Sequence, residues 1–186
     1  MHDRTANLLG AASLAVTDLL LGATSAAAAT GPSGTAALVV LSKAPGLSAT
    51  ELGRRIGLTQ SAATRMVDSL ESRGLVERRT SIGKWVAVHP TEQGWRAARA
   101  VLTTREDRVA GLLTDLDDGE RATLTTLLEK LLVAAYGENP DTFLLCRLCD
   151  RESCGDGATT HCPVGAADVE ARAVEARAQG EQDGRA

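Results

Sequence analysis

The sequence predicts a mainly α-helical protein with one small β-ribbon. Aromatic residues make up only 2% of the 186 residues, so the core must be built from Leu, Val and Ala, which favours closely packed helices over a β-sandwich or barrel. Apolar residues recur at helical spacing in the long segments, whereas positions 75–80 and 84–89 alternate apolar and polar residues about a tight turn. The length suits one domain with appended segments.

The first predicted helix covers residues 8–29, which contain a single charged side chain, Asp18. By hydropathy this stretch could be a signal peptide or a membrane span. A carboxylate at mid-span costs about 2.5 to 3.5 kcal/mol on insertion scales, and Asp3 offsets Arg4 where a signal peptide needs net positive charge. We therefore expect a cytoplasmic protein without a membrane segment, in which this helix buries an apolar stripe of Leu8, Ala12, Val16, Leu19, Leu20 and Ala23.

Two further helices are predicted before residue 57. Ser33, after the break at Gly31-Pro32, is expected to cap a helix that runs to Lys43. Ser48 and Glu51 then have the spacing of a capping box, in which each side chain bonds to the backbone N–H of the other residue. This capping box predicts the start of a short helix.

The short helix stops at Gly57, and Thr59 is expected to cap a longer helix that ends near Arg73. Two helices joined by a few residues that include Gly are typical of a helix-turn-helix. The second, or recognition, helix has an apolar inner face of Ala63, Met66, Val67 and Leu70.

The alternating segments 75–80 and 84–89 predict a two-stranded ribbon around the turn Ser81-Ile82-Gly83. A ribbon that directly follows a helix-turn-helix makes the module winged. In such modules the recognition helix reads the major groove of DNA, and the ribbon contacts the flanking backbone or minor groove.

A long amphipathic helix is predicted from Thr91 to about Leu116, and Asp117-Asp118 opens another that ends near Gly137. The second of these has a strong apolar face formed by Leu124, Leu127, Leu128, Leu131 and Leu132. Residues 166–186 are rich in Ala, Glu, Arg and Gln, a composition typical of either a solvated helix or a disordered tail.

All four cysteines lie in one 17-residue window, as Cys146-x2-Cys149-x4-Cys154-x7-Cys162. Four thiolates that begin with a Cys-x-x-Cys turn suit a tetrahedral metal site, because the first pair binds from one turn and the second pair completes the shell. Zinc is slightly favoured over an iron–sulfur cluster, which uses the same ligands. A redox dithiol or disulfide pair and free thiols are the alternatives.

The winged module carries local positive charge. Residues 48–90 contain seven basic and four acidic side chains, although the whole chain has a net charge of −4. Gln60 and Arg65 can make bidentate contacts to bases, and Ser61 and Thr64 can contact bases or phosphates. Ser48 and Thr59 are also predicted to bind DNA, although either could serve equally as a plain helix cap. Two basic residues of the ribbon complete the predicted set: Arg78 and Lys84.

Three segments resemble the MarR family of bacterial transcriptional regulators: Gly57-Leu-Thr-Gln-Ser61 with Thr64-Arg65, Leu70-Glu-Ser-Arg-Gly-Leu-Val-Glu-Arg78, and Thr91-Glu-Gln-Gly94. The resemblance covers about residues 5–137. It implies a two-fold homodimer that binds pseudo-palindromic double-stranded DNA, with the first and last long helices in the dimer interface. It also implies a small-molecule effector bound between the dimer helices and the winged module.

The wing and the cysteines depart from the family pattern. Many members have a longer wing with an Asp-x-Arg pair whose Arg enters the minor groove, whereas here only Lys84 stands near the tip. The cysteine segment lies outside the common pattern. The resulting organisation is an N-terminal dimerisation helix (1–34), a winged helix-turn-helix (35–90), C-terminal dimerisation helices (91–137), a four-cysteine metal-binding segment (138–165) and a flexible or helical tail (166–186).

The sequence thus favours a dimeric DNA-binding regulator, expected to be a repressor, whose DNA affinity is modulated through the cysteine site. An enzyme is not expected, because the chain has no Gly-rich phosphate loop, no Ser/His/Asp arrangement and no nucleophile elbow. A thiol-based redox oxidoreductase is the rival interpretation. In a third interpretation, the protein is a regulator whose cysteine site is purely structural.

Overall fold

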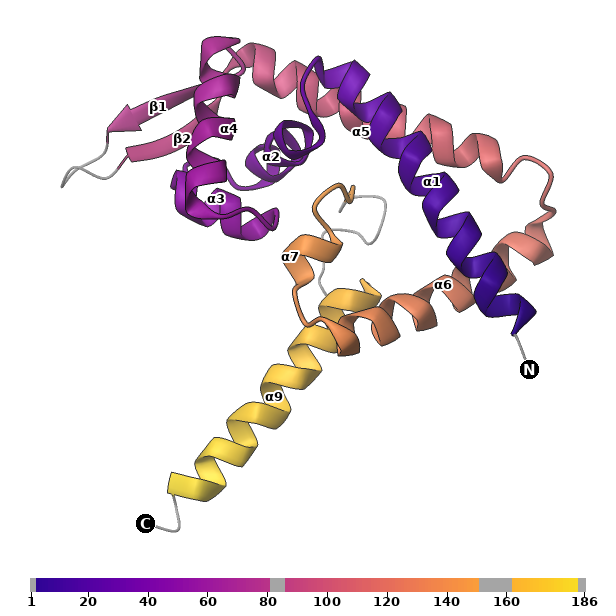
Figure 1. The fold of residues 1–186 in the computed structure, drawn as a ribbon. Coiled ribbons are helices and arrows are strands. Elements are labelled where there is room, and N and C mark those ends of the chain that lie inside the picture. The colour runs from indigo at the N-terminus through magenta and orange to yellow at the C-terminus, as the bar shows by residue number, and fades with distance from the viewer. Residues whose placement is uncertain (1–2, 81–85, 151–161, 184–186) are drawn as a thin grey trace. The chain divides into compact units, whose positions relative to one another are not determined.

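The computed structural model describes residues 3–80, 86–150 and 162–183 (Figure 1). They fold into helices and a two-stranded sheet, which confirms the predicted fold class. Contacts divide the chain into two compact units, Met1–Asp115 and Leu116–Ala186, which are described separately below.

Two long helices, α1 (Arg4–Ala28) and α5 (Glu92–Leu112), lie side by side in the first unit (Figure 1). The Asp3 carboxylate caps α1 by accepting the N–H of Thr5 at 2.8 Å. By length and composition α1 could cross a membrane. It packs against α5 and buries Thr24 and Ala28, whereas large apolar side chains of its N-terminal half are exposed: Leu8, Leu9 and Leu14.

The core of the first unit is centred on α2 (Pro32–Lys43), which contacts α1, α3, α4, α5 and the ribbon. Leu38 and Leu41 are completely buried. The prediction that Ser33 caps α2 is wrong: Gly31 is the N-cap, and Pro32 begins the helix. Proline is favourable at this first position because its missing N–H would have no partner there and its fixed φ suits the helix.

The helix-turn-helix is formed by α3 (Ala49–Arg55) and α4 (Gln60–Ser72), as predicted. The two helices touch where Gly53 faces Ala63, and a Cβ on Gly53 would overlap the Ala63 Cβ. Gly57, in the connection, has φ 75°, which glycine adopts without strain. Both glycines are therefore needed for the angle and closeness of the helix pair.

The ribbon pairs β1 (Val76–Thr80) with β2 (Val86–Pro90) in antiparallel register, from Val76 opposite Pro90 to Thr80 opposite Val86. The predicted turn at residues 81–83 lies outside the described residues. One addition was not foreseen, because Leu47 forms a bridge with Val88 and so ties the segment before α3 to the ribbon.

In the second unit, α6 (Asp118–Glu138) and α9 (Pro163–Asp183) pack together, and α9 also contacts α7 (Thr142–Leu145). Asp117 and Glu120 form a capping box at the start of α6. The Tyr136 hydroxyl donates to Asp168 at 3.0 Å and so joins the two long helices. The tail is helical, one of the two predicted states.

Candidate DNA-binding surface

The recognition helix α4 has two distinct faces. Its inner face is buried by the residues that the sequence predicted: Ala63, Met66, Val67 and Leu70. Its outer face at the N-terminal end is exposed and polar, and it is formed by Gln60, Ser61, Thr64 and Arg65. The four side chains predicted to read DNA therefore share one solvent-facing surface over about one and a half turns.

Arg65 is the charged member of this surface. Among the described residues, no hydrogen bond or ion pair involves its guanidinium. Thr64, beside it, donates its hydroxyl to the Gln60 carbonyl at 3.1 Å, which leaves the hydroxyl oxygen as an acceptor. The surface can thus supply a guanidinium and an amide for base edges and hydroxyls for phosphates.

Ser48 and Thr59 act as helix caps in the structure. The Ser48 hydroxyl accepts the Glu51 N–H at 3.1 Å, and the Thr59 hydroxyl accepts the Ala62 N–H at 3.4 Å. The Ser48 hydroxyl keeps its own proton for donation, and the Thr59 hydroxyl also lies 3.4 Å from the Ser61 hydroxyl, so a phosphate contact at either residue stays a prediction.

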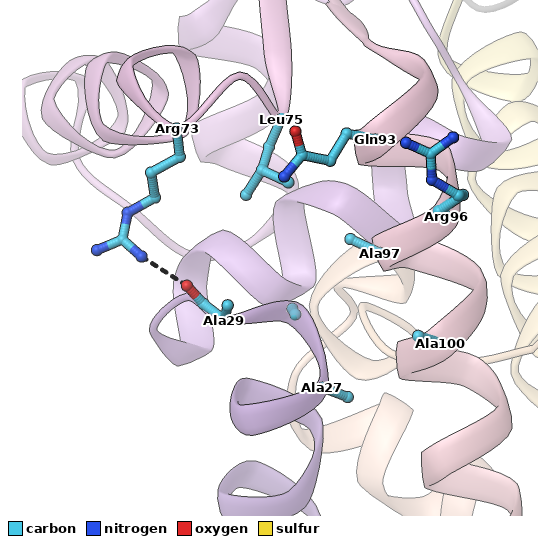
Figure 2. A pocket seen from close by; sticks show the side chains of 9 residues that line it. Ala27, Ala29, Arg73, Leu75, Gln93, Arg96, Ala97 and Ala100 are labelled. Carbon is cyan, nitrogen blue, oxygen red and sulfur yellow. Dashed lines mark hydrogen bonds between the residues drawn. The ribbon is translucent and has the colours of Figure 1, made fainter.

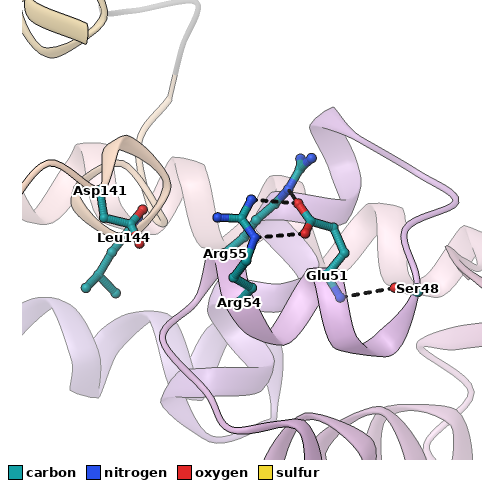
Figure 3. Close-up of polar contacts among 6 residues, drawn as sticks. All are labelled: Ser48, Glu51, Arg54, Arg55, Asp141 and Leu144. Carbon is teal, nitrogen blue, oxygen red and sulfur yellow. Dashed lines mark hydrogen bonds and ion pairs between the residues drawn. The ribbon is translucent and has the colours of Figure 1, made fainter. Parts of the chain in front are cut away.

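The capping box predicted at the start of α3 is only half formed (Figure 3). The Glu51 carboxylate turns to two arginines instead, accepting from Arg54 at 2.9 Å and from Arg55 at 2.7 Å. Hydrogen bonds from Arg54 and then Arg55 lower the pKa of Glu51 to about 2, against the opposing effect of burial. The competing guanidiniums explain why the carboxylate does not reach back to the backbone.

Arg78, predicted to bind DNA, joins the wing to the recognition helix. From β1 its guanidinium binds Glu71 and, at 2.6 Å, Asp68, both on α4, and its backbone N–H donates to Glu71 at 3.1 Å. Burial disfavours the charge on Arg78, but the hydrogen bonds to Asp68 and Glu71 outweigh it and raise its pKa. The C-terminal half of α4 therefore presents carboxylates already paired with a cation.

The other predicted wing contact, Lys84, lies outside the described residues. Arg79, nearer the wing tip than Arg78, is exposed and pairs with Glu77 on the same strand at 2.5 Å.

The cysteines are described in part. Cys146 follows α7, and its carbonyl accepts the N–H of Cys149 at 3.0 Å, which closes the Cys-x-x-Cys segment into a tight turn. Cys162 precedes α9, where its sulfur accepts the Gly165 N–H at 3.4 Å. Cys154 lies outside the described residues. Within residues 3–80, 86–150 and 162–183, no three His, Cys, Asp or Glu side chains are gathered to hold a metal, so the four-thiolate site remains a prediction.

Sequence reasoning missed a role for Arg73. This residue directly follows α4, and its guanidinium donates to the Ala29 carbonyl at the end of α1, 44 positions earlier, at 2.5 Å. No local pattern predicts such a contact, because it depends on how α1 and α4 are placed by the core.

Comparison with known proteins supports the winged module. Residues 33–84 match the family model of the MarR family. No curated protein sequence matches the chain. The family consists of transcriptional regulators, not enzymes, in agreement with the sequence-based expectation.

The fold is similar to solved structures of the same family. A MarR family protein from Bacillus stearothermophilus is 27% identical, with a TM-score of 0.59 over 70% of this chain and 95% of that one. MarR from E. coli is 25% identical, with a TM-score of 0.57 over 71% and 99%. The Mycobacterium tuberculosis protein Rv2887, solved in complex with DNA, is 28% identical, with a TM-score of 0.51 over 66% and 96%. The chain is therefore similar to transcriptional regulators of the MarR family, whose family model residues 33–84 match.

Proposed function

We propose that the protein is a cytoplasmic transcriptional regulator that binds a pseudo-palindromic DNA operator as a homodimer and represses by occupying it. The observation that carries this proposal is the exposed polar surface of α4, formed by Gln60, Ser61, Thr64 and Arg65 opposite a fully apolar inner face. The similar protein Rv2887 has been crystallised with DNA, which supports the assignment.

Within this surface, Arg65 and Gln60 read base edges, and Ser61, Thr64 and the wing residue Lys84 contact bases or phosphates. Arg78 acts differently: it holds β1 against α4 through Asp68 and Glu71, so it orients the wing for its phosphate contacts.

A DNA-binding measurement tests the proposal. We expect duplexes selected from a random library to contain two related half-sites, and Arg65→Ala to lose about 1 to 3 kcal/mol of binding energy with relaxed choice at one base position per half-site. Arg99→Ala, an exposed arginine on α5, is the matched control and should bind like wild type. Equal affinity for selected and random duplexes would rule the proposal out.

Homodimer formation is supported by apolar side chains that the single chain leaves uncovered. In α1 these are Leu8, Leu9 and Leu14, and in α6 they are Leu127, Leu128, Leu131, Leu132 and Val133. Large exposed apolar patches mark interaction sites. A second copy of the chain would cover them and would place two recognition helices on the two half-sites of one operator.

We also propose that a small-molecule effector modulates DNA binding. Rv2887 has been crystallised with salicylic acid and with p-aminosalicylic acid, at 28% identity to this chain. Effector binding should change operator affinity at least fivefold, the lower end of usual allosteric coupling, when the effector is added to a preformed DNA complex.

For the C-terminal unit we propose a metal site at Cys146, Cys149, Cys154 and Cys162, with zinc slightly favoured over an iron–sulfur cluster. The tight turn at Cys146–Cys149 and the contact between α7 and α9 support it. Elemental analysis and an absorption spectrum after anaerobic purification separate the outcomes: bound zinc without colour, bound iron with visible absorbance, or neither. The last outcome contradicts the proposal and indicates free thiols.

The same site can be regulatory or structural. If it is regulatory, metal removal should change operator affinity by more than about fivefold. If it is a structural clasp, metal removal should make the tail protease-sensitive while DNA binding persists.

A further inference from the structure

The end of the recognition helix is tied to the end of α1 by one side chain (Figure 2). Arg73 is the C-cap of α4, and its guanidinium donates to the Ala29 carbonyl at 2.5 Å. Among residues 3–80, 86–150 and 162–183, no other side-chain hydrogen bond or ion pair joins α4 and its following turn to α1. Arg73 therefore provides a direct connection in addition to α2, which packs against both helices.

The Ala29 carbonyl lies where a helix needs an outside partner. Ala29 ends α1 in a left-handed conformation, at φ 48° and ψ 36°, and its N–H donates to the carbonyls of Ser25 and Ala26. The last carbonyls of a helix have no intrahelical N–H to accept, and the negative end of the helix dipole favours a cation there. The Arg73 guanidinium supplies both the donor and the positive charge. The bond is exposed, so it can break without opening the core.

The turn after α4 is held against α5 in a different way. The Thr91 hydroxyl donates to the Gly74 carbonyl at 2.6 Å, and the Thr91 N–H donates to the Leu75 carbonyl at 3.1 Å. Gly94 packs directly on this turn, since a Cβ there would lie 2.0 Å from the Leu75 carbonyl oxygen. Close backbone contacts therefore fix the turn to α5, whereas one exposed side chain fixes the end of α4 to α1.

The bond to α1 restricts the direction of α4. This helix has 13 residues and spans about 20 Å at a rise of about 1.5 Å per residue. A rotation of about 10° at its C-terminal end would move its other end, which carries Gln60 and Arg65, by about 3 Å, close to the 3.4 Å rise of one base pair. In the proposed dimer α1 lies in the interface. The direction of α4 relative to α1 therefore sets the distance between the two recognition helices.

We propose that Arg73 is a positioning residue that fixes the operator spacing, meaning the number of base pairs between the two half-sites that the dimer accepts. It acts through the Ala29 carbonyl and does not contact DNA. With the bond in place, the two recognition helices fit one spacing. Without it, each helix can turn about the contact between Gly74 and Thr91, and neighbouring spacings become acceptable. The inference rests on the proposed function and deepens it, because it names the residue that sets operator spacing.

Duplexes with altered spacing test the proposal by fluorescence anisotropy. The half-sites of the selected operator are placed at their native spacing and at one base pair more or less. We expect the wild type to bind the altered duplexes at least about tenfold more weakly than the native one, because the second half-site is then displaced and rotated about the DNA axis. In Arg73→Ala the difference should shrink to less than about threefold, because several directions of α4 are populated.

Two further variants assign the effect to the bond between Arg73 and Ala29. Arg73→Lys keeps a cation that donates hydrogen bonds, so it should retain a difference of about fivefold or more. Arg96→Ala is the matched control and should keep the wild-type difference, since Arg96 is a nearby arginine of α5 that donates to Glu92 at 2.5 Å (Figure 2). A loss of stability alone would weaken binding to all duplexes by the same factor.

Three results with these duplexes would overturn the proposal. The first is an unchanged difference between native and altered spacing in Arg73→Ala. The second is an equal change in Arg96→Ala. The third is a salt dependence of DNA binding whose slope falls by about 1 per protomer in Arg73→Ala, because that loss identifies Arg73 as a phosphate ligand.

A distance measurement without DNA separates this inference from the proposed function. Spin-labelled amino acids are introduced at Thr17 on α1 and Ser61 on α4, both exposed, in full chains diluted with unlabelled protein. Pulsed electron paramagnetic resonance should give one narrow distance distribution with Arg73 present and an about twofold wider one in Arg73→Ala, because further directions of α4 become populated. Equal widths would overturn the proposal. A wider distribution in a protein that binds no specific duplex would contradict the proposed function and leave the positioning role of Arg73 standing.

Discussion

Individual arginines of the winged module have different roles that a charge count cannot separate. Arg54 and Arg55 are bound by Glu51, Arg78 is bound by Asp68 and Glu71, and Arg73 reaches the end of α1. Arg65 stands apart on the exposed face of α4. Within the part of the chain that the structure describes, the arginine charge left for DNA therefore lies at the N-terminal half of the recognition helix, and it is smaller than the local excess of basic residues suggests.

At the residue scale, Gly53 should be essential for stability. The Cβ of Gly53→Ala would overlap Ala63, and such overpacking usually costs about 1 to 3 kcal/mol. Gly111, inside α5, has nothing within 4 Å of its Cβ position, so Gly111→Ala should stabilise the protein by about 0.5 to 1 kcal/mol. Chemical denaturation followed by circular dichroism measures both. Similar stability of the two variants would show that α3 and α4 can move apart without cost.

The Glu51 cluster should contribute a pH-dependent stability. Its folded-state pKa of about 2 lies below the ordinary value of 4.5, so the stabilisation is present above about pH 4.5 and is lost as the pH falls towards 2. Because the pairs are partly exposed and screened by solvent, we expect no more than about 1 kcal/mol. Glu51→Gln should abolish this part of the pH dependence and keep the cap, which uses the backbone N–H of residue 51. An unchanged pH profile of unfolding in the variant would contradict the assignment.

At the scale of elements, the wing and the recognition helix behave as one piece. Arg78 of β1 binds two carboxylates one turn apart on α4, and its backbone N–H binds one of them as well. Three bonds from one residue fix both the position and the direction of the strand relative to the helix. The ribbon base is further held by Leu47, which pairs with Val88 on the other strand.

Exchanging the charges of the Arg78–Glu71 ion pair should show whether Arg78 positions the wing or contacts DNA directly. Arg78→Glu alone places three carboxylates together, so DNA affinity and stability should both fall. The double variant Arg78→Glu with Glu71→Arg restores an opposite-charge pair and should recover most of both. Arg78→Gln should leave the salt dependence of DNA binding unchanged, whereas loss of a phosphate contact would reduce its slope by about 1 per bound protomer. If Arg78→Gln reduces the slope of the salt dependence and the double variant does not recover DNA affinity, Arg78 is a phosphate ligand.

Local sequence signals predicted the elements of the winged module well, because caps and glycines act over a few residues. Thr59 caps α4, as predicted, and α5 begins directly after Thr91, close to its predicted start. Contacts set by tertiary packing could not be predicted: the bond from Arg73 to Ala29 and the bridge at Leu47. The ion pairs of Glu51 with Arg54 and Arg55 are local, at i,i+3 and i,i+4 spacing, and the charge pattern could have predicted them. The candidate DNA-facing residues were predictable because the apolar inner face of α4 defines its outer face.

At the scale of the whole molecule, apolar side chains that one chain does not cover occur in both units. In the first unit the most exposed is Leu14 of α1, at 70%. In the second unit Leu127, Leu128, Leu131 and Leu132 share one face of α6, whereas Val133 lies outside that face. Helices of this composition bury their apolar side chains against other helices. We predict that the exposed apolar side chains of α1 and α6 are both buried in a symmetric dimer.

The dimer should therefore depend on the apolar face of α6. Leu128→Glu combined with Leu131→Glu places two carboxylates on that face, where a dimer interface would bury them without partners, at a cost of several kcal/mol. We expect sedimentation equilibrium to show monomers at concentrations where the wild type is dimeric, together with loss of the dependence of Tm on protein concentration. Thr126→Glu, on the opposite and exposed side of α6, is the matched control and should remain dimeric. If the double variant stays dimeric with unchanged Tm, the face of α6 lies outside the interface, and any dimer contact must come from other surfaces.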